Sequence, residues 1–113
     1  MKYISTRGKA EPKGFLEILL EGLASDGGLY MPEEYPQLDL QMLRGCGYID
    51  IAHFVLSRYA PDIPDYDLMD IIDRTYRADT FGSREITPLK ILEPGLALLQ
   101  LSNGPTLAFK DVA

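Results

Sequence analysis

One lysine near the C-terminal end of this sequence stands among apolar residues. Lys110 follows Phe109 within Ser102–Ala113, a segment that opens with the turn-forming residues Asn103-Gly104-Pro105. A lysine buried at the N-terminal end of a helix loses its proton more readily, because low dielectric and the helix dipole both disfavour the ammonium form. The neutral amine is a nucleophile that can form a Schiff base with a carbonyl cofactor. Lys110 is therefore the candidate for covalent chemistry in this chain.

Two backbone paths are open for the segment that carries Lys110. Pro105 suits the first turn of a helix, which would run through residues 107–113 and bury Lys110 among Leu107, Phe109 and Val112. In the other path Asn103-Gly104 forms a hairpin turn, residues 106–109 form the return strand, and Lys110 points to water. Local chemistry favours the second path, because a single lysine in an apolar setting is common.

The residues before this segment must build the body that positions it, and most of them are predicted to be helical. Four leucines at i, i+3, i+4 and i+7 predict one face of an amphipathic helix, which ends at the glycines of Ser25–Gly28. Three aspartates are expected to cap further helices. Short extended segments are predicted at Lys2–Ser5 and Leu29–Met31. The leucines are Leu16, Leu19, Leu20 and Leu23, and the aspartates are Asp39, Asp50 and Asp65.

The pattern changes after Phe81-Gly82. Prolines and Gly95 separate two short apolar segments, Leu89–Leu92 and Leu96–Leu101, which predicts two strands joined by a Pro-Gly turn. The organisation is then a helical body followed by a β segment that leads into the lysine motif. We therefore divide the chain into residues 1–82 and residues 83–113.

Composition limits the class of protein. The chain has 113 residues, of which 46% are hydrophobic and 25% charged, and this predicts one domain with a modest core. Eleven basic and seventeen acidic residues give 11 − 17 = −6, and no basic block forms the positive stripe of a nucleic-acid-binding protein. No apolar stretch approaches the roughly 20 residues of a membrane span, and no signal peptide is evident. We expect a cytoplasmic protein that binds neither nucleic acid nor membrane.

Five aspartates invite a metal-site interpretation that their spacing does not support. They lack the glycine turn and the final glutamate of a calcium loop, and they fit the solvated face of a helix. We therefore expect no metal site. The aspartates are Asp62, Asp65, Asp67, Asp70 and Asp73.

Other chemically suggestive residues also have simpler interpretations. Cys46 and His53 are the single cysteine and histidine, and nothing in their spacing brings them together as a nucleophile and its base. Ser25–Gly28 follows a helix instead of opening one, so a turn is favoured over a phosphate cradle. Four arginines are conceivable contacts for a substrate phosphate, but each is more simply a surface charge. They are Arg7, Arg74, Arg77 and Arg84.

The C-terminal motif resembles that of a known family. The run from Asn103 to Asp111, Asn-Gly-Pro-Thr-Leu-Ala-Phe-Lys-Asp, is similar to the lysine motif of threonine synthase, commonly His-Gly-Pro-Thr-Leu-Ala-Phe-Lys-Asp. The segments 3–8 and 22–30, with Pro32, also resemble the opening of that family. Asn103 stands where some members carry histidine. Because asparagine does not titrate near neutral pH, we expect a structural role for it in the turn.

The resemblance implies an α+β fold: a small, mostly helical N-terminal domain with short strands, followed by the first β segment of a fold-type II catalytic region. It implies a pyridoxal 5'-phosphate enzyme that converts O-phospho-L-homoserine and water to L-threonine and phosphate. It also implies that Lys110 binds the cofactor covalently and later transfers protons, while the cofactor ring serves as the electron sink.

The sequence ends three residues after Lys110. In the family that it resembles, most segments that bind cofactor and substrate lie further along, so we expect the 113 residues alone to be inactive. Two alternatives stay open: a stand-alone interaction or regulatory module, and a related phospholyase that releases a keto acid. The apolar segment Leu96–Leu101 could favour association, so the oligomeric state also stays open.

Overall fold

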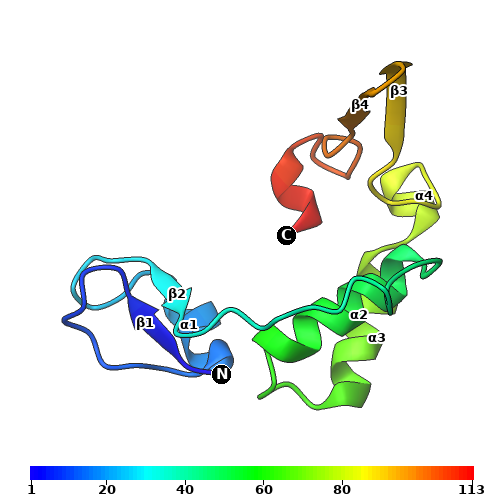
Figure 1. Ribbon diagram of the computed structural model, residues 1–113. Helices are drawn as coiled ribbons and strands as arrows, with labels where there is room; N and C mark the ends of the chain where they lie inside the picture. Colours follow the sequence, from blue (N-terminus) through cyan, green and yellow to red (C-terminus); the bar gives the residue numbers. More distant parts are fainter.

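The structure is a computed structural model that describes all residues from Met1 to Ala113. Its elements form three groups along the chain (Figure 1): two short strands with a helix, three consecutive helices, and a β-hairpin followed by a C-terminal turn. The molecule is extended, with a Cα radius of gyration of 16.3 Å, whereas a compact chain of this length has roughly 13 Å. The α+β class expected from the resemblance is confirmed.

The first group is a two-stranded antiparallel sheet with a helix between its strands. Strand β1 (Tyr3–Ser5) pairs with β2 (Tyr30–Pro32), and Ile4 lies opposite Met31. Helix α1 (Phe15–Glu21) connects them through the glycine turn at residues 25–28. The predicted order of strand, helix, glycine turn and strand is confirmed. The strand boundaries differ by one residue, and the helix ends at Glu21, before Leu23.

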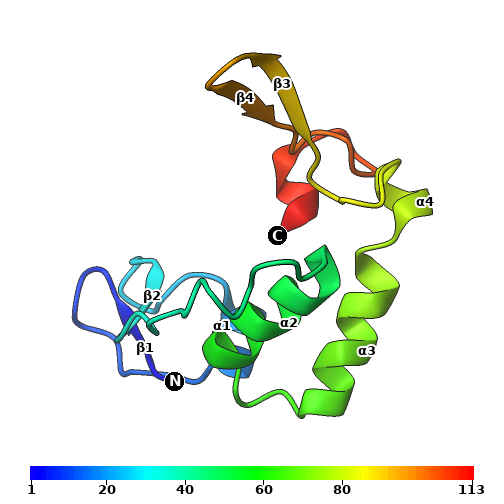
Figure 2. The same ribbon diagram turned by 45° about the vertical axis from the view of Figure 1, so that its right-hand side comes forward.

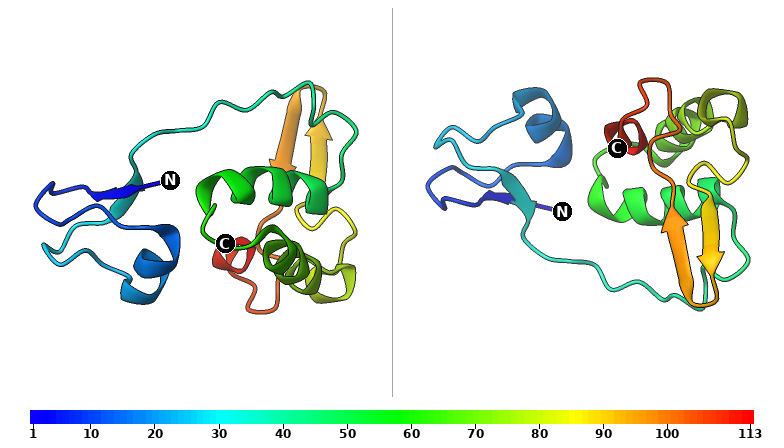
Figure 3. Two further views of the ribbon diagram at one scale, coloured as in Figure 1. Left: turned by 90° about the horizontal axis from the view of Figure 1, so that it is seen from below. Right: turned by 90° about the horizontal axis from the view of Figure 1, so that it is seen from above.

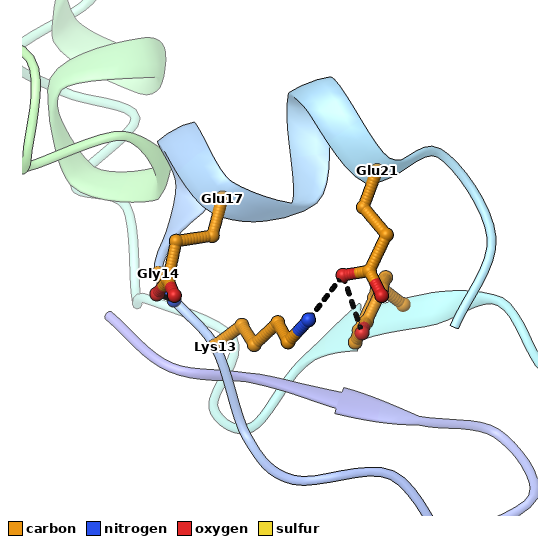
Figure 4. Close-up of polar contacts among 5 residues, drawn as sticks. Lys13, Gly14, Glu17 and Glu21 are labelled. Carbon is orange, nitrogen blue, oxygen red and sulfur yellow. Dashed lines mark hydrogen bonds and ion pairs between the residues drawn. The ribbon is translucent and has the colours of Figure 1, made fainter. Parts of the chain in front are cut away.

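Helix α1 is held at both ends by polar contacts. At its start, the Glu17 carboxylate accepts a 2.9 Å hydrogen bond from the Gly14 N–H, which caps an otherwise free helical donor. At its end, Lys13 Nζ lies 2.5 Å from Glu21 Oε2, as Figure 4 shows. Gly22 then ends the helix with φ +78°, a conformation that suits glycine.

The leucines of α1 and Leu23, just beyond it, are directed to solvent. Leu19, Leu20 and Leu23 are 62%, 91% and 59% exposed. The leucine spacing correctly predicts a helix that carries Leu16, Leu19 and Leu20, but Leu23 lies beyond its end. The spacing contains no information about what the leucines contact.

The second group contains helices α2 (Tyr48–Tyr59), α3 (Asp65–Thr75) and α4 (Ala78–Phe81). Helices α2 and α3 pack as a pair, and the two buried residues of α3, Leu68 and Ile72, stand one turn apart. With Phe81 and Ile86 they form most of the small core of this part of the chain.

The aspartate caps differ from the prediction. No helix follows Asp39, which instead accepts a 2.9 Å bond from the Gln41 N–H in a series of turns. Helix α2 begins before Asp50, whose carboxylate caps it from inside by accepting a bond from the Gly47 N–H at 3.1 Å. Asp65 is the first residue of α3 and follows Pro64. A carboxylate can satisfy free N–H groups from several positions near a helix start, so the residue type alone does not fix the boundary.

Two hydrogen bonds join the first group to the second. The Tyr3 hydroxyl donates to the Tyr59 carbonyl at 2.5 Å, and the Leu16 N–H donates to Asp62 Oδ2 at 2.8 Å. A long connecting segment runs between the groups, from β2 to the start of α2 (Figure 3).

The third group begins with the predicted hairpin. Strand β3 (Leu89–Glu93) pairs antiparallel with β4 (Leu96–Leu99), with Lys90 opposite Leu98 and a bulge before Glu93. The hairpin projects away from the helices (Figure 2), and all residues of both strands are exposed.

The chain buries less surface than its length predicts. Ten residues are buried and the accessible surface is 8166 Å², whereas a compact protein of this mass exposes roughly 6,200 Å². Small groups of apolar contacts therefore replace the expected single core, and much of the exposed apolar surface belongs to α1 and to the hairpin. No helix has the length and apolar character to cross a bilayer.

Candidate functional site

Lys110 lies in a short 3₁₀ helix, η1 (Phe109–Val112), at the C-terminal end of the chain. Its side chain is exposed and belongs to none of the four ion pairs of the structure. The amine is therefore accessible from solvent and unpaired.

Each predicted backbone path to Lys110 is correct only in part: a short 3₁₀ helix at Phe109–Val112 replaces the longer helix of the first path, and Lys110 is exposed as in the second. Residues 104–108 form turns and bends, so there is no helix from Pro105 and no return strand. The burial expected for the helical path is wrong in this chain, because Leu107 and Phe109 are 73% and 65% exposed. Leu107 has φ +59°, a strained value for this residue type. The turn must therefore be held by contacts that backbone propensity does not reveal.

The carboxylate of Asp111 provides these contacts. Asp111 Oδ1 accepts a 2.6 Å bond from the Thr106 hydroxyl, and Oδ2 accepts a 2.8 Å bond from the Thr106 N–H. The Thr106 hydroxyl and nearby backbone N–H groups lower the pKa of the Asp111 carboxyl, so the carboxylate stays charged. Gly104 is buried beside it: a Cβ there would lie 2.5 Å from the Asp111 Cβ. Gly104, Thr106 and Asp111 thus close one loop, which we call the lysine loop (residues 104–111).

Asn103 fastens the start of the lysine loop to the core. Its Nδ2 donates to the carbonyl of Phe81 at 2.6 Å and to that of Ile86 at 2.9 Å. Because both acceptors are carbonyls, they fix which end of the amide carries the nitrogen. Oδ1 is buried without a partner. The expected structural role of Asn103 agrees with these contacts.

Tyr76 fastens the other end of the segment. Its hydroxyl donates a 2.8 Å hydrogen bond to the carbonyl of Val112. The ring packs edge-on against Tyr48 at 4.9 Å between centroids, and burial raises the pKa of the Tyr76 phenol. The residues around Lys110 are therefore tied to α3 on one side and to the α4 region on the other.

The turn at Ser25–Gly28 is structural, as predicted. One carboxylate, that of Asp26, accepts bonds from the Ser5 hydroxyl (2.7 Å) and from the backbone N–H groups of Gly28, Lys9 and Ala10. The Ser5 hydroxyl, aided by these N–H groups, lowers the pKa of Asp26 to about 2. The donors that a phosphate would need are thus already used within the chain.

Tertiary structure gives His53 a partner that the sequence does not indicate. His53 Nε2 lies 2.7 Å from Asp65 Oδ1, which joins α2 to the start of α3. Cys46 is exposed and its thiol points to the Met42 carbonyl at 3.4 Å. Both side chains line one open hollow of about 350 Å³, with no hydrogen bond between them.

Three of the four arginines have contacts within the chain. Arg7 donates to the Asp26 carbonyl at 2.8 Å, while Arg74 and Arg77 pair with Asp70 and Asp79. Arg84 is exposed and forms no ion pair. None of the four lies among the contacts that hold the lysine loop.

The roles of Thr106, Asp111 and Tyr76 are absent from the local analysis of the sequence. For the first two a signal exists, since a threonine and an aspartate flanking a proline turn are frequent partners of free backbone N–H groups. Tyr76 carries no such signal, because its contact with Val112 joins residues 36 positions apart.

Together the fold and the lysine loop define an α+β N-terminal region that leads through a hairpin into a lysine-bearing turn. The sequence profile described as "Threonine synthase N terminus" matches residues 2–76. The chain belongs to this family. Its whole length is 54% identical to part of a threonine synthase from Methylobacillus glycogenes, of which it covers 26%. It is 42% identical to "Threonine synthase-like 2" from Mus musculus, of which it covers 24%.

A solved structure shows the same fold. The chain superposes with a TM-score of 0.92 and 44% identity on a threonine synthase from Brucella melitensis described as bound to PLP. The match covers 99% of this chain and 25% of that one. The chain thus spans about a quarter of the length of the relatives that it matches.

Proposed function

We propose that this chain is the N-terminal part of a pyridoxal 5'-phosphate enzyme that converts O-phospho-L-homoserine and water to L-threonine and phosphate. One observation carries the proposal: an exposed Lys110 without an ion pair stands on a braced loop, in a chain that superposes almost entirely on a PLP-bound threonine synthase. Members of the same family share the fold, and a lysine amine is the group that holds this cofactor.

The residues around Lys110 fit the reactive end of the cofactor. The amine is accessible to a carbonyl carbon, and Phe109, the preceding residue, is also exposed. When bound, the cofactor supplies an electron sink for charge that develops on the substrate. Lys110 would hold it, release it to the substrate amine, and then move protons at Nζ. We assign the groups that bind the cofactor phosphate and the substrate to the remainder of the protein.

We further propose a boundary after Gly82, with residues 1–82 forming the N-terminal domain and residues 83–113 beginning the catalytic domain. Support comes from the family profile, which covers residues 2–76, and from the hairpin, which projects from the helices (Figure 2). The exposed leucines of the hairpin and of α1 fit burial against the remainder of the protein. The 113 residues alone are therefore expected to be inactive.

A phospholyase that releases a keto acid is the second candidate, because the similarity to a relative named "Threonine synthase-like 2" also extends over the whole chain. Both candidates use the lysine in the same way. The reaction that follows loss of phosphate separates them.

The test uses the full-length protein, O-phospho-L-homoserine and pyridoxal 5'-phosphate, with chromatographic analysis of all products. Threonine with an equal amount of phosphate supports the proposal, and a keto acid supports the second candidate. The absence of both products would favour a module without catalytic chemistry. Lys110→Ala is expected to abolish product formation. Lys90→Ala, which removes another exposed lysine on β3, is the matched control and should retain activity. Threonine formation by Lys110→Ala would refute the assignment of Lys110.

A further inference from the structure

The lysine loop contains an acidic residue directly after Lys110, yet the two side chains do not pair. Both oxygens of Asp111 are bound to Thr106, at 2.6 Å and 2.8 Å, and no ion pair of the structure includes Lys110. A carboxylate that reaches the Lys110 amine would hold the lysine in its charged, non-nucleophilic form. Thr106 occupies the carboxylate instead.

The same contacts fix the backbone on both sides of Lys110. They bridge five positions, from residue 106 to residue 111, and they enclose Leu107 at its unfavourable φ of +59°. Gly104 leaves room for this closure, since any Cβ would collide with Asp111. A lysine side chain has many rotamers, so a fixed backbone limits the positions that its amine can reach and reduces the entropy lost when it reacts.

We propose that Thr106 and Asp111 are positioning residues for Lys110: their contact holds the loop that presents the amine and keeps the Asp111 carboxylate from pairing with it. The inference rests on the proposed function, because it assumes that Lys110 is the residue that binds the cofactor. It adds roles for two residues that touch neither cofactor nor substrate in this account.

Two substitutions separate the two effects. Thr106→Val keeps the shape of the side chain and the backbone N–H donor to Oδ2 but removes the hydroxyl donor, so the loop loosens and Oδ1 of the carboxylate is free to approach Lys110. Asp111→Asn also loosens the loop, because an amide offers one acceptor to the two donors of Thr106, but it leaves no carboxylate. Thr106→Ser keeps the hydroxyl and is the conservative variant. Ser83→Ala is the matched control, because it removes a hydroxyl that donates to an exposed carboxylate, Glu85, at 2.5 Å.

The experiment uses the full-length protein in cofactor-free form and has two readouts. The first is the rate at which added pyridoxal 5'-phosphate attaches to Lys110, followed by absorbance and by borohydride reduction with peptide mapping. The second is the pH profile of Lys110 labelling by trinitrobenzenesulfonate. The charged and titratable groups at this turn are Asp111 itself and, from α3, Tyr76, which contacts the Val112 carbonyl. Thermal melting of every variant reports whether it is folded.

Thr106→Val should slow attachment about tenfold, as expected for a lost hydrogen bond to a charged group, and should move the labelling profile to higher pH. Asp111→Asn should slow cofactor attachment without moving the labelling profile to higher pH. Thr106→Ser and Ser83→Ala should behave as the unmodified protein. If Thr106→Val attaches the cofactor and labels like the unmodified protein, the inference is wrong. If Thr106→Val does not fold, the test rests on Asp111→Asn and Thr106→Ser. An equal rate of cofactor attachment in Asp111→Asn and in the unmodified protein then overturns the inference. Neither readout requires threonine formation, so the proposed reaction can fail while this inference stands.

Discussion

The hydroxyl of Tyr76, at the end of α3, donates a 2.8 Å hydrogen bond to the carbonyl of Val112, two residues after Lys110. This bond joins the helical part of the chain to the segment that carries Lys110. It is partly buried, and the phenol ring also packs against Tyr48 and Phe81.

Tyr76→Phe removes this hydroxyl and keeps the ring. We expect the free energy of unfolding to fall by about 1 kcal/mol, the usual net value of a hydrogen bond, and the amides of residues 109–113 to exchange faster with solvent. Urea denaturation and hydrogen exchange measure the two effects. Tyr66→Phe is the control, because the Tyr66 side chain is 84% exposed. Unchanged exchange at residues 109–113 in Tyr76→Phe would show that the bond does not hold the segment.

Asn103→Leu tests the attachment of the lysine loop to the α4 region. The substitution leaves the carbonyls of Phe81 and Ile86 without their donor, and we expect a loss of roughly 1–3 kcal/mol in the free energy of unfolding. Asn103→His, which keeps an N–H donor, should lose less. Denaturant titration of the three proteins gives the order, and equal stability of Asn103→Leu and the unmodified protein would contradict the structural role.

Gly28→Ala tests the close approach in the N-terminal turn. A Cβ at Gly28 would lie 2.1 Å from the Ser5 hydroxyl oxygen, so the Ser5–Asp26 contact must break or shift. We expect a cost of about 1–3 kcal/mol, as for other overpacked sites. Gly47→Ala is the control, because its Cβ would find its nearest neighbour at 3.6 Å. The double variant Ser5→Ala/Gly28→Ala should be less destabilised than the sum of the single variants; simple additivity would exclude a clash with the hydroxyl.

The stability of the N-terminal turn should depend on pH through Asp26. Folding lowers its pKa to about 2 from an ordinary value of 3.8, so the folded state binds this proton less tightly than the unfolded state. Its contribution is therefore complete above about pH 4 and is lost as the pH falls through about 2. Thermal melts of the unmodified protein and of Asp26→Asn should differ most at neutral pH and converge near pH 2. Asp73→Asn, at an exposed position, serves as the control. A constant difference across this range would refute the assignment.

Much of the fold was predictable because it depends on neighbours in the sequence. Leucines at helical spacing define α1, the Pro94-Gly95 pair defines the hairpin turn, and two glycines define the turn at residues 27 and 28. Helix starts were less accurate, because Asp39 and Asp50 satisfy backbone donors from positions that the residue type does not distinguish.

The candidate site was predictable only in part. Lys110 was indicated by the motif that contains it, and its exposure agrees with the path that local chemistry favoured. The burial expected for the helical path is wrong, because Leu107 and Phe109 are exposed. Burial results from contacts with residues remote in sequence, and an apolar neighbour one or two positions away does not provide those contacts.

The sequence by itself determined most of the helices and strands and the family, and it indicated Lys110 as the candidate residue, because these depend on residue order over short distances. Tertiary structure alone decided that Asn103 bonds to Phe81 and Ile86, that Tyr76 holds Val112, and that His53 meets Asp65. These contacts join residues 12 to 36 positions apart. Only the folded path of the chain brings such groups within hydrogen-bonding distance, so no local pattern could specify them.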